Sequence, residues 1–216
     1  MEKKFILTDK FVINSFGIKL FQIKCTKSFK YAQKGDFGGY VEKEGNLDQK
    51  NDAWVSGNAR VFGNARVSSN ARVSGDAWVS DNARVSGNAW VSSNAWVYGD
   101  ARVSGNARVS GDARVSGNAR VSGDARVSGN AWVSGDADIE NDNEHCGFDG
   151  LGSCNRHTHA YMTKEKKVEI ICGCFRGSIE EFEKKVEETH SGTVYEKQYK
   201  SIINVIKIKF GLTDFT

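Results

Sequence analysis

Four arginines recur at a constant interval in the middle of the chain and have the chemistry of an anion-binding strip. They lie 18 residues apart, at Arg66, Arg84, Arg102 and Arg120, in a stretch that has no lysine between residues 51 and 163. A planar guanidinium group binds a carboxylate or a phosphate with two parallel hydrogen bonds, which a lysine cannot do. The spacing therefore predicts docking of an acidic protein, a phosphate-rich ligand or a nucleic acid. The alternative is a duplicated unit whose splayed arginines bind nothing.

Aromatic residues in the same region have the chemistry of a protein contact. Trp78 and Trp96 lie 18 residues apart, and Phe62 and Tyr98 stand where the surrounding sequence has serine. We expect these four side chains to share one surface and to form an exposed apolar patch that contacts a second copy or another protein. The alternative is that tryptophan and arginine on neighbouring strands cover each other by cation–π stacking.

Histidines and cysteines concentrate after residue 144, where they have the chemistry of a general base or of metal ligands. His145, Cys146, Cys154, His157 and His159 fall within fifteen residues. Their spacing matches no standard zinc knuckle, so we expect no metal and no cofactor, and a zinc site here stays the open alternative. The five cysteines are an odd number, which favours free thiols in a reducing compartment over a disulfide framework.

These candidate residues are carried by a repeat that dictates the fold. The phrase Asn/Asp-Ala-Arg/Trp-Val-Ser-Gly occurs fifteen times between Asp52 and Ile139 with few departures. Ala and Val share one side of a short strand, and the bulky residue between them points away. Ser-Gly-Asn then turns the chain, because glycine and asparagine tolerate left-handed backbone angles. Three such sides make an 18-residue coil, so the repeat predicts five triangular coils filled with Ala and Val.

Outward positions 18 residues apart are predicted to stack on neighbouring coils, at the strand spacing of about 4.8 Å. The first face then carries Trp54, Arg72, Trp90, Arg108 and Arg126. The second face carries Arg60, Trp78, Trp96, Arg114 and Trp132. The third face carries Arg66, Arg84, Arg102, Arg120 and Asp138. At each corner, neutral asparagines separate the aspartates, which avoids stacking like charges.

The repeat unit also resembles a known signature. Val55–Arg60 is similar to the hexapeptide of left-handed parallel β-helices, which has an aliphatic residue first and small residues second and fifth. The resemblance implies a mainly β fold, a left-handed parallel β-helix. The left hand comes from the resemblance alone, since the general crossover rule favours right-handed connections.

The flanks carry a second resemblance. Gly35–Leu47 and Cys172–Phe182, together with Thr189 and His190, resemble the flanks of hexapeptide-repeat proteins of phages and prophages. This likeness implies a non-enzymatic phage-type interaction protein, with inhibition of a host defence system as a candidate role. It places the protein in the host cytoplasm.

An enzymatic alternative follows from the fold. Many left-handed β-helix proteins are acyltransferases that use an acyl-CoA donor and a catalytic histidine. Here the coils run without an insertion, and no histidine occurs between residues 51 and 144. The base would have to come from His145, His157 or His159. We therefore expect a binding protein, with the acyltransferase as the alternative.

The repeat divides the chain into three regions. Residues 1–51 read as an N-terminal β cap with strands at Phe5–Thr8 and Ile18–Cys25, followed by a degenerate first coil through Leu47. Residues 52–140 form the β-helix. Residues 141–216 read as an α+β cap, with a Gly-rich connector at 147–153 and strands at Thr158–Thr163 and Val168–Cys172.

The end of the chain is predicted to contain a capped helix. It begins after Ser178 with a capping box and an apolar stripe at Ile179, Phe182 and Val186. Ion pairs are expected from Glu180 to Lys184 and from Glu181 to Lys185. The segment Tyr195–Phe210 reads as helical at its start and strand-like from Ile206.

Charge and hydropathy limit the remaining possibilities. The net charge is only +3, so any basic surface must be local. The first apolar run, Phe5–Leu7, is too short for a signal peptide, and no segment is predicted to span a bilayer. We expect a cytoplasmic protein without membrane association.

Overall fold

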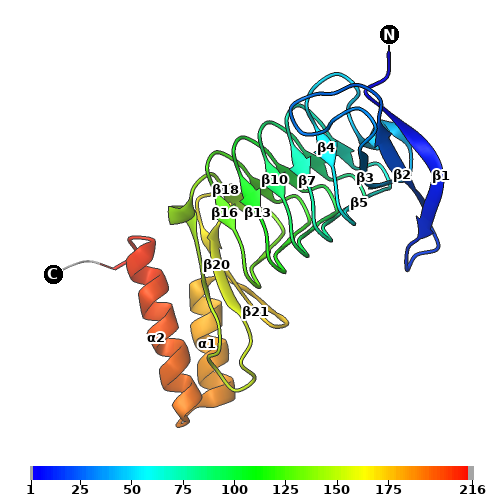
Figure 1. Cartoon of the computed structure of the whole chain (residues 1–216). Coiled ribbons are helices and arrows are strands. Elements are labelled where there is room, and N and C mark those ends of the chain that lie inside the picture. The colour runs from blue at the N-terminus through cyan, green and yellow to red at the C-terminus, as the bar shows by residue number, and fades with distance from the viewer. Residues whose placement is uncertain (1, 214–216) are drawn as a thin grey trace.

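The computed structural model describes residues 2–213 and shows a parallel β-solenoid with different structures at its two ends (Figure 1). An antiparallel sheet lies at the N-terminal end. A second antiparallel sheet and two helices lie at the C-terminal end. The predicted fold class is therefore confirmed. No helix among residues 2–213 is long and apolar enough to cross a membrane.

Fifteen two-residue strands build the regular part of the solenoid. The first face contains β4 (Trp54–Val55), β7 (Arg72–Val73), β10 (Trp90–Val91), β13 (Arg108–Val109) and β16 (Arg126–Val127). The second face contains β5 (Arg60–Val61), β8 (Trp78–Val79), β11 (Trp96–Val97), β14 (Arg114–Val115) and β17 (Trp132–Val133). The third face contains β6 (Arg66–Val67), β9 (Arg84–Val85), β12 (Arg102–Val103), β15 (Arg120–Val121) and β18 (Asp138–Ile139).

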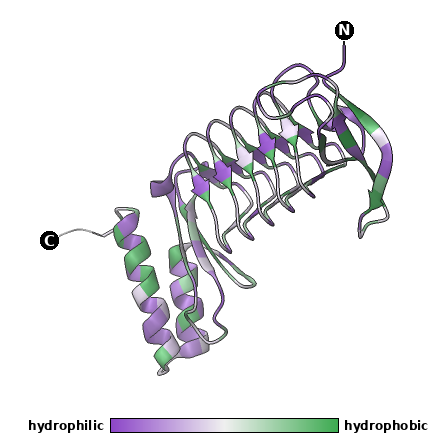
Figure 2. Ribbon diagram, in the orientation of Figure 1, coloured by the Kyte–Doolittle hydropathy of each residue, from purple (hydrophilic) through white to green (hydrophobic). Residues whose placement is uncertain are grey.

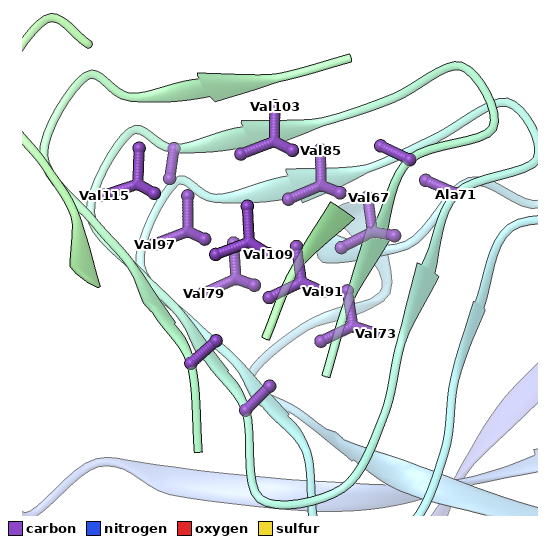
Figure 3. Packing of buried hydrophobic residues seen from close by; sticks show 14 of the residues in the cluster. Val67, Ala71, Val73, Val79, Val85, Val91, Val97, Val103, Val109 and Val115 are labelled. Carbon is purple, nitrogen blue, oxygen red and sulfur yellow. The ribbon is translucent and has the colours of Figure 1, made fainter. Parts of the chain in front are cut away.

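The register of these strands is the one that the 18-residue period predicts. Each strand residue pairs in parallel with the residue 18 positions further on, as Arg84 does with Arg102 and Val85 with Val103. Ala and Val fill the narrow interior, and the valines of the three faces point into one core (Figure 3). Val103 and its neighbours in this core are fully buried. Each strand therefore places a hydrophobic residue beside an outward one, and in Figure 2 the strands of the first face show green next to purple or pale segments.

Side-chain amides stack along the corners as predicted. At the corner before the first face, Asn70 Nδ2 donates to Asn88 Oδ1 over 3.2 Å, Asn88 donates to Asn106 over 3.1 Å, and Asn106 donates to Asp124 over 2.9 Å. An amide donor thus faces the carboxylate of Asp124, because asparagine carries both a donor and an acceptor.

The N-terminal region extends the second face. β1 (Phe5–Ile13), β2 (Lys19–Cys25) and β3 (Phe37–Val41) form an antiparallel sheet, and β3 then pairs in parallel with β5. The short 3-10 helix η1 (Glu44–Asn46) precedes Leu47, which pairs with Val67 on the third face. The predicted degenerate coil is confirmed and brings the solenoid to about six turns. The first predicted strand is confirmed but continues to Ile13.

The C-terminal region closes the other end. A 3-10 helix η2 (Asp142–Glu144) leads into the antiparallel strands β19 (His145–Phe148), β20 (Thr158–Met162), β21 (Val168–Cys172) and β22 (Phe175–Gly177). β20 and β21 were predicted, whereas β19 was not, and its last two residues lie in the predicted connector 147–153. Tyr161 and Ile171 join the solenoid core, and Ile170 faces a second core that includes the helices.

The two helices differ from the expectation in two respects. α1 (Ile179–His190) has the predicted capping box, in which Glu181 N donates to Ser178 Oγ and Ser178 N donates to Glu181 Oε2. The expected ion pairs of Glu180 and Glu181 with lysines do not form among residues 2–213, because both carboxylates bind Ser178. The strand expected from Ile206 was wrong.

α2 (Val194–Lys209) remains helical to its end because of how its apolar residues are spaced. Tyr199, Ile202, Ile203 and Ile206 form a buried stripe with intervals of three and four residues. Packing of this stripe against α1 outweighs the two-residue alternation of isoleucine and lysine near the end.

Candidate binding site

The aromatic residues predicted on the second face line a groove of about 570 Å³. Trp78 and Trp96 come from β8 and β11, and Phe62 and Tyr98 come from the corner that follows this face. One wall was not predicted, since it comes from the turn between β1 and β2. We call this site the aromatic groove, and its further lining residues are Phe16, Ile18, Gly63, Ser80 and Asp81.

The turn between β1 and β2 is shaped so that Phe16 lies over the solenoid. Asn14 Oδ1 accepts hydrogen bonds from the backbone N–H groups of Phe16 and Ile18, at 3.0 and 2.9 Å. The Phe16 ring lies 6.2 Å from Phe62 and 6.4 Å from Trp78. Phe16 itself remains 67% exposed, which makes it the most accessible apolar side chain of the groove. An apolar residue at a hairpin tip was the signal in the sequence that could have revealed it.

One of the four predicted aromatics is not on the surface. Phe62 is only 5% exposed, because Phe16 covers it and Trp78 packs edge-on against it at 5.9 Å. The prediction of an exposed Phe62 was therefore wrong, and Phe62 forms the floor of the groove. Trp96 is 39% exposed, and Trp78 and Tyr98 are partly exposed.

Trp78 and Trp96 form the rigid wall of the groove. Their rings stack with centroids 5.2 Å apart and planes within 7°. Arg60 lies over the outer face of Trp78 at 5.1 Å, and Arg114 lies over Trp96 at 5.5 Å. The cation–π stacking offered as the alternative thus occurs together with the groove. Because the ring faces are covered, the ring edges are what the groove offers to a partner.

The four arginines of the third face form the strip that their spacing predicts. Strand pairing places Arg66, Arg84, Arg102 and Arg120 on successive rungs, and all four are exposed. None of them makes an ion pair or a cation–π contact with any residue from 2 to 213.

On the other two faces, arginines stack on tryptophans of neighbouring strands. Arg72 stacks on Trp90 at 4.7 Å and also on Tyr31, and Arg108 contacts the same tryptophan. The third face has no aromatic rung, so its guanidinium groups keep their hydrogen-bond donors and their charge available to a partner. We call these four residues the arginine ladder.

Three of the four histidines, His145, His157 and His159, come together beneath β17. The rings of His145 and His157 lie 5.3 and 5.6 Å from His159. His159 Nδ1 donates to the carbonyl oxygen of Trp132 over 3.0 Å, and its Nε2 therefore accepts from His145 Nδ1 over 3.1 Å. His157 Nδ1 lies 2.8 Å from Asp149 Oδ1.

Burial controls the protonation of this histidine cluster. His159 is 1% exposed, and burial lowers its pKa to about 3, with further lowering by the two neighbouring histidines. Burial also lowers the pKa of His145. A neutral imidazole at His159 ties the C-terminal sheet to the last coil.

The cysteines take no part in the histidine cluster as a ligand set. Cys154 lies on the surface and shares a separate hollow with Cys172 and Cys174. All five cysteines are free. Among residues 2–213, no group of three or more His, Cys, Asp or Glu side chains has the geometry to hold a metal ion.

The groove and the ladder are therefore surface features of a parallel β-solenoid. Within it, the repeats match the profile of a family described as the YdcK Beta solenoid repeat, over residues 53–69, 65–81, 77–93, 95–111, 107–119, 113–128 and 119–135. A comparison with curated proteins found no match. The family match is to a β-solenoid repeat, and the narrower resemblance to phage hexapeptide-repeat proteins stays a prediction.

Proposed function

We propose that this protein is a non-enzymatic binding protein that holds a protein partner through the aromatic groove. The partner inserts one or two large apolar side chains, and the arginine ladder attracts an acidic or phosphate-bearing part of the same partner. The observation that carries this proposal is the groove, in which two separate parts of the chain bring five aromatic rings together.

The energetics of the groove support a contact. Phe16 and Trp96 keep much of their apolar surface in water, at 67% and 39% exposure. Covering such side chains in a preformed hollow contributes roughly 25 cal/mol for each Å² of apolar area removed from water. Tryptophan and tyrosine in rigid, partly enclosed positions are typical of residues that dominate protein interfaces.

The arginine ladder supports the anionic side of the contact. Four unpaired guanidinium groups on one flat face attract an acidic surface during diffusion and raise the rate of association at low salt. The resemblance of the flanks to phage and prophage proteins supports a bacterial host protein as the partner. Inhibition of a host defence protein is the specific form of this proposal.

Tryptophan-to-arginine exchanges on the second face test the proposal. Trp78→Arg with Trp96→Arg removes the wall of the groove and introduces the residue that the repeat itself uses at these positions, so the coils should remain folded. Trp132→Arg is the matched control, because Trp132 lies on the same face, is 37% exposed and does not line the groove.

Affinity capture from host lysate and light scattering are the measurements. We expect the double variant to lose the captured partner and Trp132→Arg to keep it. Loss of self-association in light scattering, with no partner captured by the wild type, would identify a second copy as the occupant. Equal capture by all three proteins would refute a role for the groove.

The histidine cluster favours one alternative, an acyltransferase that uses an acyl-CoA donor. The three histidines do converge, and Asp149 orients His157 as a base would require. His159, however, is buried and hydrogen-bonded on both nitrogens. We expect no saturable binding of coenzyme A in calorimetry. Acyl transfer that is lost in His145→Gln with His157→Gln would establish the alternative.

A further inference from the structure

A polar hollow of about 600 Å³ lies at the N-terminal end of the arginine ladder. Arg66 and Arg84 border it from the third face, and Lys43 borders it from the segment between β3 and η1. The corner before the third face contributes Asn64, Asn82 and Asp100. Two solenoid arginines and a lysine from outside the regular coils thus surround one space.

The charges around this hollow are unbalanced. Lys43, Arg66 and Arg84 make no ion pair with residues 2–213, and Asp100 is the carboxylate in the lining, which leaves a net charge of +2. Glu42 is not part of this lining, and its Oε2 accepts from Gly63 N, next to Asn64, over 2.6 Å. The hollow is therefore an electropositive site.

Amide donors complete the site. Asn64 Nδ2 donates to Asn82 Oδ1 over 3.2 Å, and Asn82 Nδ2 donates to Asp100 Oδ1 over 3.1 Å. Each of these amide nitrogens carries two hydrogens, and the row uses one of them. The second N–H of each amide stays available beside the guanidinium groups. Amide donors of the corner therefore border the same hollow as the charges of Lys43, Arg66 and Arg84.

The hollow and the aromatic groove share one corner. In three successive coils, the turn at this corner contributes one residue to the groove and another, one or two positions later in the sequence, to the hollow. The pairs are Phe62 and Asn64, Asp81 and Asn82, and Tyr98 and Asp100. A ligand in the hollow is thus separated from the groove by the width of a single turn.

We propose that this hollow binds a phosphate monoester. Its net charge matches the charge of about −1.5 to −2 that a phosphate monoester carries at neutral pH, whereas a single carboxylate would leave half of it unmatched. Arg66 and Arg84 lie on neighbouring strands, whose backbones are about 4.8 Å apart, and each guanidinium group can donate a pair of hydrogen bonds to phosphate oxygens. This inference deepens the anionic contact of the proposed function by confining it to one end of the ladder.

The test compares two double variants that remove the same charge from the same face. Arg66→Gln with Arg84→Gln alters the hollow, and Arg102→Gln with Arg120→Gln alters the ladder beyond it. Inorganic phosphate and O-phosphoserine are titrated into each protein, and the side-chain amide resonances of Asn64 and Asn82 are followed by NMR. We expect saturable binding to the wild type, a loss of about tenfold or more in the first variant, and less than about twofold in the second.

The outcomes separate this inference from the proposed function. Equal weakening in both variants would show diffuse attraction by the ladder and would overturn the site. Absence of saturable phosphate binding would overturn it as well, and partner capture through the groove would still be judged by the tryptophan variants.

If phosphate binds as expected, phosphatase treatment of a captured partner identifies the source. Capture that is lost after treatment indicates a phosphorylated side chain. Unchanged capture indicates a free phosphorylated molecule.

Discussion

Lowering the pH from 7 to 5 should destabilise the junction between the last coil and the C-terminal sheet, through His159. This side chain is 1% exposed, and its two nitrogens are used by Trp132 O and His145 Nδ1. Protonation of Nε2 would remove the acceptor for His145 and place a charge among His145, His157 and the buried Tyr161. The native state therefore keeps this imidazole neutral.

The magnitude follows from the two pKa values. An unfolded histidine has a pKa of about 6.5, and burial lowers that of His159 to about 3 in the folded protein. Between these values the unfolded state binds more protons, so stability is lost as the pH falls. The loss between pH 7 and pH 5 amounts to about 2 kcal/mol. It changes little for any folded pKa below about 4, because the titration of the unfolded chain then sets it.

Thermal unfolding at both pH values measures this effect, with His159→Asn as the control. Asparagine keeps an N–H donor for Trp132 O but does not titrate. For a chain of this length, about 2 kcal/mol corresponds to a fall of roughly 4 to 8 °C in Tm. We expect His159→Asn to be less stable at pH 7 and to lose about 2 kcal/mol less than the wild type on going to pH 5. The lowered pKa of His145 acts in the same direction, so the difference between the two proteins is the informative quantity.

Direct titration gives an independent check. Imidazole nitrogen shifts should show that His159 stays neutral in the folded protein at pH 5. A midpoint near 6.5, or the same pH dependence of stability in His159→Asn, would refute the reasoning.

Two further changes test the solenoid itself. Val103→Asp should abolish folding, because it places an unpaired charge at a fully buried position. Circular dichroism measures the outcome. A variant whose spectrum matches that of the wild type would show that the register is wrong. Gly105→Ala should cost about 1–3 kcal/mol more than Gly129→Ala in thermal unfolding. Both glycines have φ of +65°, but a Cβ at Gly105 would lie 2.8 Å from Gly123 N, whereas nothing lies within 4 Å at Gly129. Equal costs would contradict the stacking of these turns.

The regular coils were predictable because their side-chain pattern allows one register. A shift of one residue would turn Ala and Val outward and bury arginine. The 18-residue period therefore assigned Trp78, Trp96 and the whole arginine ladder to the faces on which the structure places them. The start of α1 was predictable for a similar reason, because the Ser178 capping box is a local sequence pattern.

Contacts between distant segments could not be predicted in this way. The β1–β2 turn folds over the second face and buries Phe62, and Phe29 covers Trp54 edge-on at 5.4 Å. Nothing in the local pattern of either segment says which face it will cover, because the apolar residues of a cap suit any of the three. The groove was thus predictable from its solenoid wall only, and Phe16 required the tertiary structure.

The departures from the repeat give an independent reason to place binding at this corner. A turn in this solenoid needs only serine and glycine, and most units use them. Phe62 and Tyr98 replace the serine, and Asp81 replaces the glycine at a φ of +57°, as Ser69 and Ser93 do at +59° in turns outside the groove. All three line the aromatic groove. Asp81 Oδ2 also accepts from Gly99 N over 3.0 Å and so holds the turn that carries Tyr98. Asp81 therefore has a structural role in its turn, and the two bulky replacements, Phe62 and Tyr98, are the departures from the repeat that support the proposal of a binding groove.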